Sequence, residues 1–265
     1  MENDSSAPLR EMWYFAVTGE RLRRGKMLAK TLLGEPLLLG RDAGGQVFAL
    51  RNICPHRGIP LSYGRFDGRE IECCYHGWRF APSGACTAIP SLAEGQRFDL
   101  GGVAATAYPA RELHGNVWVF FGRDPASAPE PPALPGIGAR APDIYDTVTL
   151  PCSIDHAVVG LMDPAHGPFV HRAWWWRSAR SIHEKSKAFA ASPYGFTMLR
   201  HAPSSNSKAY KLLGGAPETE ISFSLPGVRI EHIIAGKHEV VNLTAVTPLG
   251  AQETQINHAI YWTTP

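Results

Sequence analysis

Long apolar runs and basic clusters are absent from this sequence, and their absence limits where the chain works and what it binds. No 18 consecutive residues are apolar, so we predict no transmembrane helix. The first residues, Met-Glu-Asn-Asp-Ser-Ser, lack the basic and apolar regions of a secretory signal. The net charge is only +2, without a run of lysine and arginine. We therefore expect a cytoplasmic protein that has neither a membrane nor a nucleic acid as partner.

Common nucleotide motifs and a common zinc motif are also missing. No Gly-x-Gly-x-x-Gly opens a helix after a strand and no Walker loop occurs, so we expect that the chain itself binds no nicotinamide nucleotide. No Cys-x-x-Cys pair of the kind typical of small zinc sites is present. The five cysteines, an odd number without a regular framework, fit a reducing compartment where thiolates bind metals rather than form disulfides.

What the sequence does contain is two short pairs of cysteine and histidine. Cys54-Pro-His56 and Cys73-Cys-Tyr-His76 are separated by the 16 residues 57–72. Two thiolates and two imidazoles suit either a tetrahedral zinc ion or a Rieske [2Fe-2S] cluster, in which histidines replace the cysteines on one iron. Each pair lies in a turn rich in glycine or proline beside a strand-like run, which predicts two loops at the tip of a small sheet. This context favours the cluster.

The remaining cysteines and the aromatic residues near the motifs have simpler interpretations. We expect Cys74, Cys86 and Cys152 to be structural, because none fits the ligand spacing. Arg57 and Trp78 beside the ligands either shield the metal or dock a redox partner, with turn packing as the alternative.

The order of patterns along the chain predicts two domains joined by a linker. Short strand-like runs broken by glycine turns extend from about residue 13 to 121, which indicates a small antiparallel β domain. The segment 124–142 is rich in proline and reads as a linker. A strand at 143–150 and a helix at 153–163 follow, with Ser153 as N-cap and Asp155 in the first turn. The rest is again β-rich.

A second group of metal-binding residue types follows this helix, in the segment Asp163-Pro-Ala-His166-Gly-Pro-Phe-Val-His171. On a regular helix the two histidines, five positions apart, would point about 140° away from each other. Pro168 between them should break the helix and let both face one ion. Two histidines and a carboxylate form the facial triad of non-haem Fe(II) sites. The alternative is that both are ordinary, partly buried histidines.

The two motifs together resemble those of a known family. Residues 13–91, which include Cys-Pro-His-Arg-Gly and Cys-Cys-Tyr-His-Gly-Trp, are similar to the Rieske domain of ring-hydroxylating and O-demethylating non-haem iron oxygenases, of the vanillate-demethylase kind. The segment 163–171 resembles the mononuclear-iron motif of the same family. The resemblance implies that Cys54 and Cys73 bind one cluster iron, and His56 and His76 the other. It also implies that His166 and His171 bind Fe(II).

The resemblance implies an α+β fold and a division of the chain into three parts. These are an antiparallel β Rieske domain over 11–123, the linker 124–142, and a partial catalytic domain of antiparallel sheet with helices, of the helix-grip or START-like type, over 143–265. It further implies a terminal oxygenase that takes electrons from a flavin and iron–sulfur reductase or a ferredoxin and uses O2 on a small organic, aromatic substrate. Asp163 would relay electrons between subunits of a homotrimer.

Two departures from the family pattern affect the second site. Val159 and Gly160 stand where the family often has an asparagine. The third iron ligand, a carboxylate on a distant helix in the family, has no match; the carboxylates after His171 are Glu184, Glu218, Glu220, Glu231, Glu239 and Glu253. We therefore expect a truncated catalytic domain whose third ligand falls beyond residue 265. A Rieske electron carrier and an inactive paralogue remain as alternatives. For Trp174-Trp175-Trp176, packing or a subunit interface is favoured over a substrate pocket.

Overall fold

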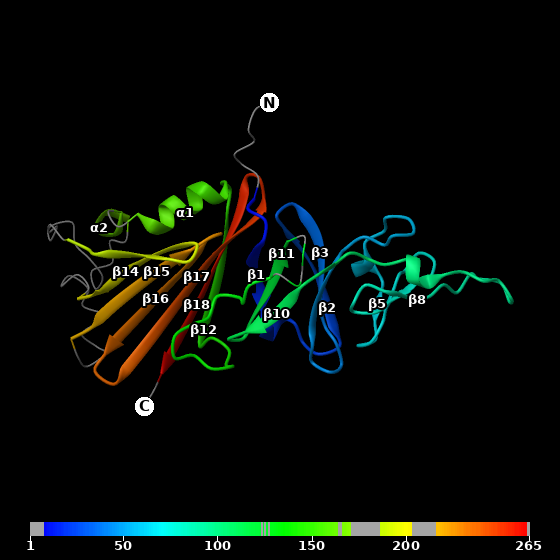
Figure 1. Ribbon diagram of the computed structural model, residues 1–265, viewed down its shortest axis with the longest axis horizontal. Coiled ribbons are helices and arrows are strands. Elements are labelled where there is room, and N and C mark those ends of the chain that lie inside the picture. Colours follow the sequence, from blue (N-terminus) through cyan, green and yellow to red (C-terminus); the bar gives the residue numbers. More distant parts are fainter. Residues whose placement is uncertain are drawn as a thin grey trace, which may run out of the picture. The chain divides into compact units, whose positions relative to one another are not determined.

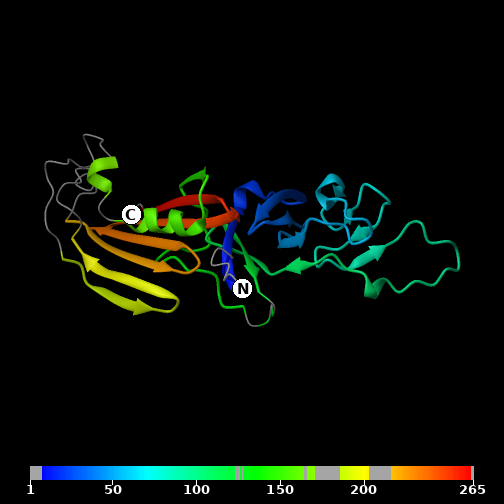
Figure 2. The ribbon, with the colours of Figure 1, turned by 90° about the horizontal axis from the view of Figure 1, so that it is seen from above.

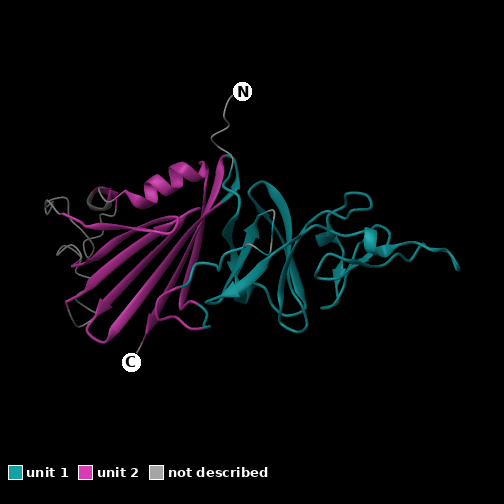
Figure 3. Cartoon of the chain, viewed as in Figure 1, with its two compact units in different colours: residues 1–133, 139–141, 248–251 teal, residues 134–138, 142–247, 252–265 magenta. Residues whose placement is uncertain are grey.

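The computed structural model describes residues 8–122, 124, 126, 128–163, 166–170, 186–202 and 216–263. The chain divides into two compact units, coloured separately in Figure 3. The first comprises 1–133, 139–141 and 248–251, and the second comprises 134–138, 142–247 and 252–265. The domain limits at 123 and 142 stay a prediction. No helix in the described part of the chain is long and apolar enough to cross a membrane.

The first unit contains three small antiparallel sheets (Figure 1). One has the order β1-β11-β10, formed by Met12–Thr18, Asn116–Phe121 and Ala110–Leu113. Another has the order β2-β3-β4-β9, formed by Lys26–Leu32, Glu35–Arg41, Val47–Arg51 and Ala107–Tyr108. The third has the order β5-β6-β7-β8, formed by Arg65–Phe66, Ile71–Glu72, Arg79–Phe80 and Cys86–Ala88. Short 3-10 helices cover Gly19–Arg21, Leu61–Tyr63 and Leu100–Gly102.

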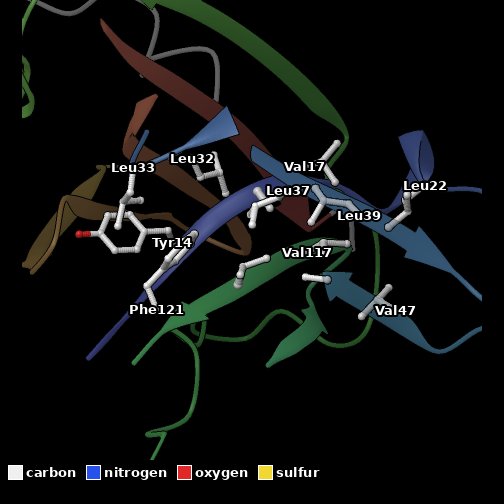
Figure 4. Close-up of a cluster of buried hydrophobic side chains, with 13 residues drawn as sticks. Tyr14, Val17, Leu22, Leu32, Leu33, Leu37, Leu39, Val47, Val117 and Phe121 are labelled. Carbon is white, nitrogen blue, oxygen red and sulfur yellow. The ribbon is translucent and has the colours of Figure 1, made fainter. Parts of the chain in front are cut away.

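Two apolar clusters hold these sheets together. The first lies between the sheets of β1 and β3, and Figure 4 shows Tyr14, Leu37, Leu39 and Val117 converging from different strands. It forms because the β-branched and leucine-rich runs alternate inward along paired strands. The second cluster packs beneath the small β5–β8 sheet and contains Phe80, Ile71 and, notably, the thiols of Cys54 and Cys73. The predicted ligands are therefore anchored in a core.

In its described residues, the second unit is one seven-stranded antiparallel sheet with two short helices. Its order is β12-β18-β17-β16-β15-β14-β13. In chain order the strands are Ile144–Leu150 (β12), Phe189–Ser192 (β13), Gly195–His201 (β14), Glu218–Ser224 (β15), Val228–Ala235 (β16), His238–Gly250 (β17) and Glu253–Thr263 (β18). The helices are α1, Ile154–Met162, and α2, Gly167–Val170. Figure 2 shows α1 running along the sheet. The predicted α+β class, mostly antiparallel sheet with few helices, is confirmed.

Helix α1 begins and ends close to the predicted positions, but its start is capped differently. Ser153 has the extended backbone of an N-cap, yet its side chain makes no capping hydrogen bond. Its hydroxyl instead lies 3.0 Å from Nδ1 of His156. Asp155 occupies the first turn as predicted, where its charge suits the helix dipole.

Candidate metal centre

The first predicted ligand loop follows strand β4 and is closed by its own backbone. The N–H of Cys54 donates to the carbonyl of Ile59 at 2.8 Å, and the N–H of Gly58 donates to the carbonyl of Cys54 at 2.9 Å. Gly58 has φ of +76°, which favours glycine at that position. The two bonds turn the chain back on itself and present His56 at the tip of the loop.

The second ligand loop lies between β6 and β7 and repeats the same pattern. The N–H of Cys73 donates to the carbonyl of Trp78 at 2.8 Å, and the N–H of Gly77 donates to the carbonyl of Cys73 at 3.0 Å. Gly77 has φ of +68°. Both cysteines are thus held at equivalent places in two matching turns, as the sequence predicted for loops at the tip of a small sheet.

The two thiols are buried side by side beneath the loops. Cys54 and Cys73 are 2% and 3% exposed. Burial raises the pKa of the Cys54 thiol; the backbone N–H of His56 opposes this shift, whereas contact with the Cys73 thiol adds to it. Metal binding therefore has to displace protons from these sulfurs, as it does wherever thiolates are ligands.

The two imidazoles lie together at the outer side of the loops. The ring centroids of His56 and His76 are 4.7 Å apart. His56 is half-buried and His76 exposed. Desolvation lowers the pKa of His56, and the charges of His76 and Arg57 lower it further, so its imidazole is readily available as a neutral ligand.

This separation into a buried thiol pair and an outer imidazole pair distinguishes the two candidate metals. A tetrahedral zinc site gathers four ligands around one ion. Among the described residues, no three His, Cys, Asp or Glu side chains gather around a single ion position. A [2Fe-2S] cluster instead needs two separate pairs, one for each iron. The residues present fit the cluster.

Aromatic rings pack on both imidazoles. The indole of Trp78 stacks on His56 with centroids 4.2 Å apart and planes only 3° from parallel. Its Nε1 is buried and has no hydrogen-bond partner. Tyr75 packs on His76 at 4.0 Å, tilted by 38°, but is 59% exposed. From the sequence we expected Trp78 to shield the metal or to dock a redox partner. Its stacking on the imidazole of His56 was not predicted.

A polar pair that the sequence motifs did not indicate supports the first loop. The side chain of buried Asn52 donates to the hydroxyl of Ser62 at 2.9 Å and accepts from the N–H of Ser62 at 2.8 Å. These bonds tie the start of the ligand loop to the segment that follows it. Asparagine before a turn is a weak sequence signal, because it serves many kinds of turn.

The three cysteines outside the ligand pairs differ from one another in burial. Cys86 is buried in the core cluster that holds the thiols, Cys152 is half-buried, and Cys74 is exposed next to a ligand. The burial of Cys86 is consistent with a structural role. For Cys74 a structural role stays a prediction.

The second predicted site is described only in part. His171 and Glu184 lie outside the described residues. His166 lies just before α2, and its Nδ1 is 2.6 Å from the backbone carbonyl oxygen of Asp163 and 3.7 Å from that residue's Oδ2. A proton on Nδ1 that donates to this carbonyl leaves the lone pair of His166 on Nε2, the arrangement usual for a metal-binding imidazole.

The break between the helices differs from the prediction. We expected Pro168 to end the helix, but α1 already ends at Met162, and Asp163 is extended with ψ of 113°. The cause is the next residue, Pro164, since a residue that precedes proline avoids the helical region. Pro168 instead occupies the first turn of α2, where proline is tolerated. The described glutamates after His171 lie on strands β15 to β18.

Comparison with known proteins agrees with this geometry. A family model for the Rieske [2Fe-2S] domain matches residues 12–108. The first unit therefore contains a Rieske domain, as the motifs predicted.

Part of the chain is also similar to subunits of oxygenase systems. The oxygenase component of dicamba O-demethylase from Stenotrophomonas maltophilia is 37% identical over 169 residues, 62% of this chain and 48% of that protein. The iron–sulfur subunit TsaM1 of the toluene-4-sulfonate monooxygenase system from Comamonas testosteroni is 42% identical over 120 residues, 45% of this chain and 33% of that protein. The chain thus spans about half the length, or less, of these curated relatives.

Solved structures extend the similarity to the second unit. Dicamba monooxygenase bound to dicamba matches 96% of this chain and 78% of its own with a TM-score of 0.76 and 25% identity. NdmA from Pseudomonas putida CBB5 with caffeine matches 94% of this chain and 73% of its own with a TM-score of 0.77, but at 18% identity it supports the fold alone. The predicted resemblance to Rieske oxygenases is confirmed.

Proposed function

We propose that this chain is part of the terminal component of a Rieske non-haem iron oxygenase. Cys54 and Cys73 would bind one iron of a [2Fe-2S] cluster, and His56 and His76 the other. The observation that carries the proposal is the pair of matching loops, with both thiols buried and both imidazoles outside. The match of the Rieske family model over the same loops supports it.

In the second unit, His166 and His171 would bind a mononuclear Fe(II). The contact between Nδ1 of His166 and the carbonyl of Asp163 supports this role, because it orients the ring and directs Nε2 outward as a ligand. Asp163 would position the ligands and connect the two metal sites between subunits of a homotrimer. A carboxylate would complete the facial triad.

When bound, the cluster would supply single electrons and the Fe(II) would activate O2. The role of this chain's own residues is to hold these groups, to keep water from the buried thiols and to orient the imidazoles. A reductase or ferredoxin would deliver the electrons. The relatives that are named monooxygenases, dioxygenases and O-demethylases support oxidation of a small, aromatic substrate.

A second candidate function is electron transfer alone. One observation favours it: all four cluster ligands lie within residues 54–76 of the first unit, so the cluster site includes no residue of the second unit. In that case the chain would carry the cluster without a working Fe(II) site.

Anaerobic reconstitution with iron and sulfide tests both functions. We expect a Rieske electron paramagnetic resonance signal after reduction with dithionite, and three irons per chain for the oxygenase. The same signal with two irons supports the electron carrier. Bound zinc, or iron without the Rieske signal, contradicts the cluster, and the variant Cys54→Ser provides the control without a site.

A further inference from the structure

A group of polar side chains lies within the sheet of the second unit and plays no part in the sites described above. Arg229 and Glu231 are on β16, Asn242 is on β17 and His258 is on β18. The side chains of Arg229 and Glu231 are only 19% and 16% exposed. Charged residues are seldom buried to this degree unless they are paired, and these two form an ion pair.

Strand register places most of this group on one face of the sheet. Residues two apart on a strand share a face, so Arg229 and Glu231 do. Asn242 is paired with Glu231 across β16 and β17, and its side chain reaches it. Arg229 and Glu231 both influence the imidazole of His258 electrostatically, so we include it with them. We call Arg229, Glu231, Asn242 and His258 the polar quartet.

The same face is turned toward helix α1. Gly227 precedes Arg229 by two residues and continues the ladder, since its carbonyl accepts from the N–H of Val246 at 2.8 Å. A Cβ added at Gly227 would lie 3.5 Å from Cγ2 of Val158 on α1. Helix α1 leads directly into Asp163 and His166. The polar quartet therefore shares its sheet face with the helix that presents the candidate iron ligands.

The hydrogen bonds within the quartet are long and leave capacity for a ligand. Nη1 and Nη2 of Arg229 both lie 3.4 Å from Oε2 of Glu231, and Nδ2 of Asn242 lies 3.4 Å from the same oxygen. Ordinary N–H···O bonds are about 2.7–3.2 Å long. Oδ1 of Asn242 is buried without a hydrogen-bond partner. The quartet thus offers donors from Arg229 and an unused acceptor from Asn242.

Apolar residues lie beside it on the same face, together with Thr244, which is paired with Arg229 across β16 and β17. Phe223 is paired with Arg229 across β15 and β16, and Ile233 follows Glu231 by two residues. Both are buried, at 8% and 3% exposed. An apolar wall that ends in a few polar groups is the usual composition of a small-molecule site.

The charge balance of the quartet restricts the ligand. Arg229 and Glu231 compensate each other. Burial lowers the pKa of His258 and the charge of Arg229 lowers it further, while Glu231 and Asp146 oppose the shift. At neutral pH the imidazole is therefore uncharged. A carboxylate placed here would meet Glu231 with no second cation to balance it, at a site where like charges repel more strongly than in water.

We propose that the polar quartet is the polar end of the substrate pocket and that it selects aromatic molecules with an uncharged hydrogen-bonding group, such as a carboxamide, over aryl carboxylates. The amide N–H donates to Oδ1 of Asn242 and the amide oxygen accepts from Arg229, while Phe223 and Ile233 contact the ring. This inference rests on the proposed function and names the substrate class of that same site.

Binding of a matched pair of ligands tests the proposal. Isothermal titration of the reconstituted full chain with 4-methoxybenzamide and 4-methoxybenzoate at pH 7.5 should show at least tenfold tighter binding of the amide. Glu231→Gln removes the opposing charge, so we expect benzoate to bind at least tenfold more tightly than it binds the wild type. Exposed Glu253, at the start of β18, provides the matched control: Glu253→Gln should leave both affinities unchanged.

A second variant keeps the test decisive if Glu231→Gln does not fold. Asn242→Leu, similar in volume, removes the acceptor and should weaken amide binding at least tenfold. Equal affinities in the wild type, preference for benzoate, absence of binding of both ligands, or unchanged selectivity in both variants would each overturn the proposal. The titration depends on neither electron transfer nor the Rieske signal, so its failure and the failure of the proposed oxygenase function give different results.

Discussion

The two units present their metal-binding side chains in different ways. In the first, all four candidate ligands lie within residues 54–76, on two loops that the backbone closes in the same manner. In the second, His166 lies just before a short helix, and its Nδ1 lies near both the carbonyl and the carboxylate of Asp163. The first arrangement is local, and this stretch of chain supplies all of it. The second depends on residues far apart in the sequence. The first site can therefore form from one short stretch of chain, whereas the second needs more than one segment.

The largest effect is expected from variants that remove a cysteine ligand of the first site. Cys54→Ser or Cys73→Ser should abolish the cluster, because one iron loses a buried thiolate that a hydroxyl does not replace. Iron per chain should fall by two and the visible absorbance should vanish. Cys74→Ser, at the exposed neighbouring position, should retain both. A full cluster in either ligand variant would contradict the assignment.

The next largest effect is expected from a variant that removes a ligand of the second site and leaves the first site intact. His166→Ala should remove one iron per chain and leave the Rieske signal unchanged, since the cluster ligands are in the other unit. His201 is the matched control, because its Nδ1 also contacts a nearby backbone carbonyl, that of Leu199 at 2.8 Å. His201→Ala should keep all the iron. Loss of the Rieske signal in His166→Ala would show that the two sites are not independent.

A smaller effect compares the two aromatic rings that pack on the two imidazoles. Reduction adds negative charge to the cluster, which a dry, low-dielectric neighbour disfavours. Replacing half-buried Trp78 with leucine admits water beside His56 and should favour reduction about tenfold, or about 59 mV for one electron. Tyr75→Leu at the exposed partner of His76 should shift the potential much less. Protein-film voltammetry measures both, and equal shifts would contradict the different roles of the two rings.

A pH measurement probes the first unit without touching either loop. Burial, and to a lesser extent Arg21, lowers the pKa of Lys30 on β2 to about 8. Between pH 8 and pH 10.5 the amine of Lys30 is protonated in the unfolded chain but not in the folded chain. The free energy of unfolding therefore increases as the pH rises through this range. Relative to Lys30→Met, the wild type should be less stable by about 3 kcal/mol at pH 7. Urea unfolding should show this gap closing by pH 10.5.

The smallest effect concerns the glycines that close the two loops. Alanine at Gly58 or Gly77 should destabilise the metal-free chain by about 1 kcal/mol through its positive φ. At Gly77 the new Cβ would also lie 3.3 Å from Cγ of Pro90, whereas nothing lies within 4 Å at Gly58. Gly77→Ala should therefore cost more in urea unfolding. The reverse order would show that the loops are not matched in rigidity.

The sequence predicted most where the chemistry is local. Ligand spacing and flanking strands identified both loops, because each turn is determined by a few adjacent residues. The helix at 153–163 was likewise predicted, and it ends close to the predicted position. The residue that ends it is Pro164 and not Pro168.

What the sequence did not predict depends on contacts between distant segments. The stack of Trp78 on His56 and the bonds between Asn52 and Ser62 require the folded loops. The polar quartet joins three strands, so it becomes visible only through register. The third iron ligand has no counterpart among the described glutamates, and no local pattern substitutes for it.

The matching closure of the two ligand loops has one further consequence. The bonds that close them run between main-chain atoms, from Cys54 to Ile59 and from Cys73 to Trp78. Their scaffold therefore depends little on the residues between cysteine and glycine that are not ligands, which are Pro55, Arg57, Cys74 and Tyr75. These residues can be substituted to tune the properties of the bound metal, while the backbone that holds the ligands keeps its conformation.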